Sequence, residues 1–77
     1  MNEDEAVEAR LIFFRDQLQA GGRVCACIDP ADPVSWRAGL LAGLLLGEQP
    51  TKAICVDVTL AAVKKGLDRL QAERREP

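Results

Sequence analysis

The stretch TKAICVDV, Thr51–Val58, decides the fold because it is compatible with two structures. The β-branched residues Ile54, Val56 and Val58 alternate with other residues, which is the two-residue period of a β-strand. The same stretch can instead form a short helix followed by a turn at residues 57–59. The segment after it is helical in both cases, so the choice lies between a helix-turn-helix and a strand followed by a helix.

In the first interpretation, residues 51–57 form a short helix and residues 60–73 form a second helix that packs across it. Ala53 is the small residue that lets the two helices approach closely, and Thr59 caps the second helix through its hydroxyl. A helix placed in this way can enter the DNA major groove and contact bases and phosphates. Besides Thr59, the residues expected at the DNA are Leu60, Ala61, Lys64, Lys65 and Arg69.

The segment VTLAAVKKGLDRLQAE resembles the recognition-helix region of GntR-type and MarR-type winged-helix regulators. The upstream segment LLAGLLLGEQP resembles the helix that precedes it in those domains, so the resemblance covers about residues 40–73. It implies transcriptional regulation by a dimer that binds a palindromic operator. The positions that match the family pattern are Val58, Thr59, Val63, Lys64, Lys65, Leu67 and Leu70.

In the second interpretation, residues 53–58 are a strand and the chain has an α-β-α-β-α order. The segments RVCACID and TKAICVD then echo each other at an offset of 28 residues, which aligns Cys27 with Cys55 and Asp29 with Asp57. A two-stranded sheet is marginal on its own in water. This interpretation therefore predicts dimerisation through the sheet, or docking onto the sheet edge of a partner.

The N-terminal half has clearer signals. Apolar residues recur on one helical face over residues 3–20, and the pair Gly21 and Gly22 is expected to end that helix. Residues 23–29 are expected to be extended. A second, largely apolar helix is expected over residues 34–47. It carries Gly39, Gly43 and Gly47 at four-residue spacing, which predicts either close packing on the first helix or a dimer or partner interface.

The composition limits the chemistry. The chain has 77 residues, so residues 1–77 are expected to form a single domain, and its net charge of −2 gives no overall basic field for nucleic acid. There is no histidine, and Ser35 is the only serine, so no Ser-His or Cys-His pair can form. Asp29, Asp32 and Asp57 are the remaining acid-base candidates, and ordinary solvated carboxylates are the expected outcome. We therefore expect no enzyme and no cofactor.

The three cysteines, Cys25, Cys27 and Cys55, lack the paired spacing of a zinc site, so no metal is expected. The odd number and the acidic N-terminal segment favour a reducing, cytoplasmic setting. The longest apolar run, Leu40–Leu46, is too short to span a membrane.

The leading hypothesis is a small, mainly α DNA-binding regulator of plasmid or phage type, a homodimer with a C-terminal helix-turn-helix. The alternative is an α/β protein-interaction adaptor or inhibitor that acts through the glycine-lined helix and an exposed strand edge.

Overall fold

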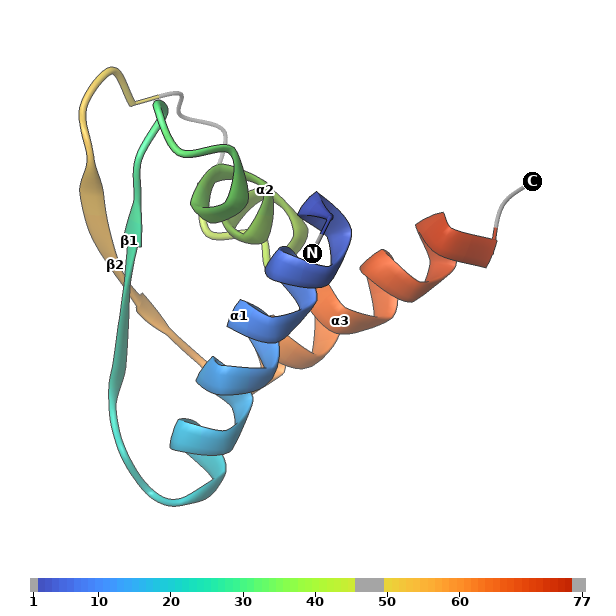
Figure 1. Cartoon of the computed structure of the whole chain (residues 1–77). Coiled ribbons are helices and arrows are strands. Elements are labelled where there is room, and N and C mark those ends of the chain that lie inside the picture. The colour runs from blue at the N-terminus through green and yellow to red at the C-terminus, as the bar shows by residue number, and fades with distance from the viewer. Residues whose placement is uncertain (1, 46–49, 76–77) are drawn as a thin grey trace.

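A computed structural model describes residues 2–45 and 50–75, which form three helices and two strands. The two strands make one layer, and Figure 1 shows all three helices on the same side of it. The order along the chain is that of the second interpretation above. The elements are α1 (Glu3–Gln19), β1 (Val24–Ile28), α2 (Pro33–Leu41), β2 (Ile54–Val58) and α3 (Leu60–Arg75).

The short helix expected at residues 51–57 is wrong, and the helix-turn-helix built on it is absent from the described residues. Residues 54–58 are instead β2, which pairs antiparallel with β1 over its whole length. Val24 lies opposite Val58, and Cys27 lies opposite Cys55. The strand prevails because its alternating side chains bury Val58 on the helix side while β1 provides partners for its backbone groups.

Local interactions define both ends of α1 and the start of α3, as the sequence predicts at Gly21 and Thr59. The Asn2 side chain accepts a hydrogen bond from the Glu5 amide at 2.8 Å, which caps α1. Gly21, with φ of +89°, adopts the left-handed conformation just after the helix, as the glycine pair predicted. Thr59 Oγ1 accepts from the Ala62 amide at 3.2 Å, so the expected cap of the last helix is confirmed.

The second helix is shorter than expected, because it ends at Leu41 and not at residue 47. Gly43 takes a φ of +70° and turns the chain out of the helix. Its amide donates to the Leu40 carbonyl, and the next amide donates to the Gly39 carbonyl, which is the Schellman pattern of a helix end. A single helical row of Gly39, Gly43 and Gly47 therefore does not form, and Gly47 lies outside the described residues.

The core lies between the helices and one face of the sheet. We call this face the helix face, and its residues are Val24, Ala26, Ile28, Ile54, Val56 and Val58. All five elements contribute buried apolar side chains to one core cluster. Its members from the helices are Val7 and Leu11 of α1, Ala38 and Leu41 of α2, and Val63 and Leu70 of α3, with Ala42 just beyond α2.

Candidate functional site: the open face and the free edge of the sheet

The side of the sheet turned away from the helices carries all three cysteines. We call it the open face and define it by Cys25 and Cys27 of β1 and Cys55 and Asp57 of β2, all four exposed. No other described element covers this side of the two strands (Figure 1). Because cysteine is among the residue types most often buried, three exposed thiols on one small surface are an unusual feature.

The register brings the thiols together in pairs. Cys27 lies directly opposite Cys55, and Cys25 lies opposite Asp57, so that Cys25 and Cys55 are diagonal neighbours. Desolvation by the surrounding residues, followed by the nearby Cys55, raises the pKa of Cys25 and that of Cys27. Within the described ranges, no three Cys, Asp, Glu or His side chains lie close enough together to hold one metal ion. The open face therefore presents a thiol pair with a third thiol beside it.

The outer edge of β2 combines partly exposed apolar side chains with a strand edge that has no partner in the described residues. The helix-face residues of β1 are buried, whereas Ile54 and Val56 of β2 are only half-buried. The reason is that α1 and α2 pack on β1, while β2 makes fewer contacts with the helices. Over residues 2–45 and 50–75, neither strand has a second strand partner. Along the outer edge of β2, unpaired backbone N–H and C=O groups therefore lie next to apolar surface.

Of the three glycines that were expected at an interface, the structure describes Gly39 and Gly43. Gly39 is buried, and a Cβ placed on it would lie 2.8 Å from Cδ1 of Ile28, so this glycine lets α2 pack directly on β1. Gly43 is exposed in the turn after α2, with open space around it. The close approach predicted by the glycine spacing is thus to β1 of the same chain, and not to α1.

The residues expected at DNA lie on α3 or directly before it, where Lys65 and Arg69 are both exposed and one helical turn apart. Lys64, Lys65 and Ala61 are exposed, while Leu60 is half-buried and Thr59 is the helix cap. Arg69 donates to the Leu41 carbonyl at 3.3 Å, where a cation satisfies a backbone acceptor at the end of α2.

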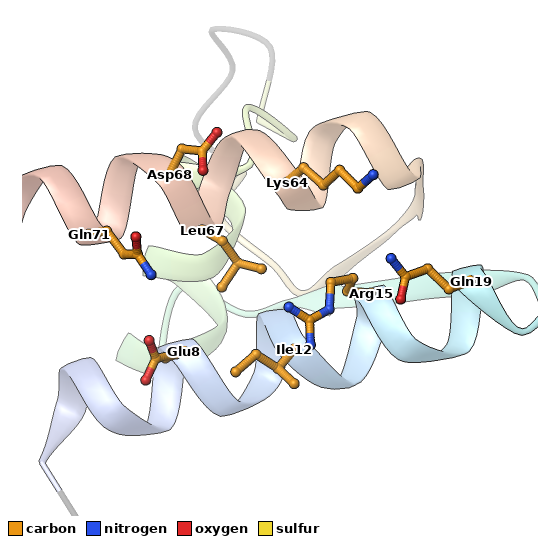
Figure 2. Close-up of a pocket in the computed structure, with 8 residues that line it drawn as sticks. All are labelled: Glu8, Ile12, Arg15, Gln19, Lys64, Leu67, Asp68 and Gln71. Carbon is orange, nitrogen blue, oxygen red and sulfur yellow. The ribbon is translucent and has the colours of Figure 1, made fainter.

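Lys64 also borders a groove of about 440 Å³ between α1 and α3. In Figure 2 the side chain of Leu67 extends from α3 toward α1, with charged and amide side chains of both helices around the groove. Charges of both signs line the groove, so it offers no uniform field to a phosphate backbone. Its lining residues are Glu8, Ile12, Arg15, Gln19, Lys64, Leu67, Asp68 and Gln71.

The three carboxylates that were considered for acid-base chemistry lie in different settings. Asp29 accepts from the Ala31 amide in the turn after β1. Asp32 accepts from the Val34 amide at the start of α2, and Asp57 lies on the open face. No hydrogen bond joins any two of them in the described residues.

The sequence predicts that residues 23–29 are extended, but it does not place Cys55 beside Cys25 and Cys27. The echo between the two cysteine segments was the available signal, since it already matched Cys27 with Cys55. The partial exposure of Ile54 and Val56 could not be predicted from the neighbouring sequence, because it depends on how the helices pack over the sheet.

Comparison of the chain with protein-family models, with curated proteins and with solved structures gives no match. None of the helices in the described ranges is long and apolar enough to cross a membrane. The geometry of the open face and of the β2 edge is therefore the basis for assigning a function.

Proposed function

We propose that this protein is a small protein-binding module that extends its sheet at the outer edge of β2, and that the strand it pairs with is β2 of a second copy. The observation that carries the proposal is the half-buried state of Ile54 and Val56 beside an unpaired strand edge. An added strand would satisfy backbone groups and cover apolar surface in one step. A four-stranded sheet would also be more stable than the two-stranded sheet of one copy, which is only marginally stable in water.

The sequence of β2 is compatible with pairing to itself. An antiparallel, two-fold arrangement centred on Val56 places Cys55 of each copy opposite Asp57 of the other. The same arrangement places Ile54 opposite Val58, so apolar residues continue across the junction on the helix face. No two like charges stand directly opposite each other, which would be destabilising across strands.

The proposal is tested by measuring mass in solution over a dilution series, by sedimentation or light scattering. We expect a concentration-dependent dimer for the natural chain. Val56→Lys places a charge on the helix face at the middle of the edge strand, which is a known protection against edge pairing, so this variant should stay monomeric. Val34→Lys is the matched control, because Val34 is also a half-buried valine but lies in α2, and it should dimerise normally.

Circular dichroism of both variants verifies that each is folded. The proposal fails if the natural chain stays monomeric at every concentration, or if folded Val56→Lys dimerises as strongly as the control. Backbone amide exchange offers an independent measurement that needs no variant. Amides of β2 should become more protected as the concentration rises, with no matching change in β1.

The DNA-binding hypothesis predicts a different experimental result. It requires a gel shift on duplex DNA that weakens steeply with salt, because neutralised phosphates release counterions. It also requires loss of that shift when Lys64 and Lys65 are both changed to Glu. The exposed lysines keep this experiment meaningful, although the helix-turn-helix that motivated it does not form in the described residues.

A further inference from the structure

We propose that Cys27 and Cys55 form a two-thiol redox site on the open face, which small disulfide compounds such as oxidised glutathione convert into a cross-strand disulfide. This inference is independent of dimerisation, because it uses the register between β1 and β2 within one chain. All three cysteines are exposed free thiols in the structure, so a small oxidant can reach them.

The register selects which two thiols react. Directly opposed residues in antiparallel strands have Cα atoms about 4.5 or 5.5 Å apart, depending on the type of pair. Both spacings fall within the range of about 4.4–6.8 Å that disulfides span. The diagonal neighbours Cys25 and Cys55 are expected at about 7–8 Å, which is beyond that range without backbone movement. Cys27 and Cys55 are therefore the pair that can close within the existing sheet.

The chemistry balances with the disulfide compound as oxidant. The thiolate of one cysteine attacks a sulfur of the compound, forms a mixed disulfide and displaces one thiolate of the compound. The other cysteine, after losing its proton to solvent, attacks the protein sulfur of the mixed disulfide and displaces the second thiolate. The two protein thiols are oxidised to one disulfide, and the compound is reduced to two thiols.

Two features of the open face shape this reaction. Desolvation and the nearby Cys55 raise the pKa of Cys27, which lowers its thiolate fraction, so the exchange should accelerate in mildly alkaline buffer. The groups that act on Cys27 are Cys55 beside it, Asp29 after β1, and Arg10 of α1, which has the opposite effect of lowering its pKa. The disulfide would also close the chain segment that runs from β1 through α2 to β2, and so restrict the unfolded chain.

The test uses oxidised glutathione and intact-mass spectrometry on the natural chain and two single variants. One tryptic peptide contains both Cys25 and Cys27, because no Lys or Arg lies between them, so variants are needed to identify the pair. The natural chain and Cys25→Ser should each lose two hydrogen atoms in mass without a glutathione adduct. Cys27→Ser should instead accumulate mixed disulfides with glutathione.

Stability provides the second readout. Oxidation should raise the urea midpoint of the natural chain and of Cys25→Ser, and reduction by dithiothreitol should reverse the rise. The inference is overturned if Cys27→Ser closes a disulfide as readily as Cys25→Ser does. It is also overturned if the natural chain yields only glutathione adducts or covalent dimers on a non-reducing gel.

Discussion

At the scale of single residues, the fold depends on positions where one atom decides how closely two elements approach. Gly39 is the clearest case, because the missing Cβ is the space that Ile28 fills. Ile28 is 1% exposed and belongs to the largest fully buried side chains, so it has little freedom to move aside. The distance between α2 and β1 is therefore set by Gly39 and Ile28, because the large side chain of one fills the space left by the missing side chain of the other.

Gly39→Ala should destabilise the protein, although alanine is the better helix former. Overpacking a core costs about 1–3 kcal/mol, and the gain in helix propensity offsets about 1 kcal/mol of it. Ile28→Val removes the Cδ1 atom that the new Cβ would meet, so the double variant should lose less stability than the sum of the two single losses. Urea unfolding of all four proteins measures this coupling, and simple additivity would contradict the packing described here.

Asp32 gives the start of α2 a dependence on pH. Desolvation opposes ionisation of this carboxyl, but hydrogen bonds from the amides of Val34 and Ser35 and the charge of Arg10 lower its pKa overall. A carboxyl whose pKa is lower in the folded state stabilises the fold above its unfolded pKa, and this contribution is lost as the pH falls through the folded value.

Asp32→Asn keeps an oxygen that can cap α2 but removes the charge. At neutral pH the natural chain should therefore have a higher urea midpoint than the variant. The difference should shrink as the pH is lowered to about 3, below the ordinary value of an Asp carboxyl. An equal difference at both pH values would show that the charge of Asp32 contributes nothing to stability.

At the scale of elements, Arg37 connects the three helices. It lies in α2, with its guanidinium paired to Glu3 and Asp4 of α1 and to Glu73 of α3, at 3.8 Å from Glu3 and 3.2 Å from Glu73. Partial burial would lower the pKa of Arg37, but the carboxylates of Glu73 and Asp4 outweigh that effect and raise it. This cluster fixes how α1 and α3 lie against α2.

Arg37→Gln should lower the free energy of unfolding by about 1 kcal/mol, and less at high salt, where exposed charge pairs are screened. Arg15→Gln is the matched control, because among the described residues the salt bridge of Arg15 is to its neighbour Asp16 inside α1. The control should be close to neutral. Equal losses for the two variants in urea unfolding would refute a connecting role for Arg37.

Helix ends could be predicted from the sequence more reliably than the secondary structure of residues 51–57. Caps and terminal glycines act within a few residues, and Gly21 and Thr59 therefore predicted helix ends correctly. Gly43 carried the same signal, but the apolar run around it suggested that the helix continued. Residues 51–57 could not be assigned locally, because a strand needs a partner, and the partner β1 lies about a third of the chain away.

At the scale of the whole molecule, the helices cover one side of the sheet, and no other element in the described part of the chain covers the opposite side. The sequence predicts that a two-stranded sheet needs completion, and among the described residues half-buried apolar side chains adjoin an unpaired strand edge at β2. Other apolar residues are exposed, notably Phe13 at 59% and Leu40 at 51%. They lie in helices, away from any unpaired backbone, so they lack the hydrogen-bonding groups that a strand edge offers.

A direct observation of contacts between two copies distinguishes pairing at β2 from association through any other surface. Isotope-filtered nuclear Overhauser spectra of a mixture of labelled and unlabelled chains report only contacts between copies. The account predicts cross-peaks centred on Val56 of one copy and Val56 of the other, flanked by Cys55 to Asp57. A dimer whose contacts arise from Phe13 or Leu40 instead, or a sample with no contacts between copies, would contradict it.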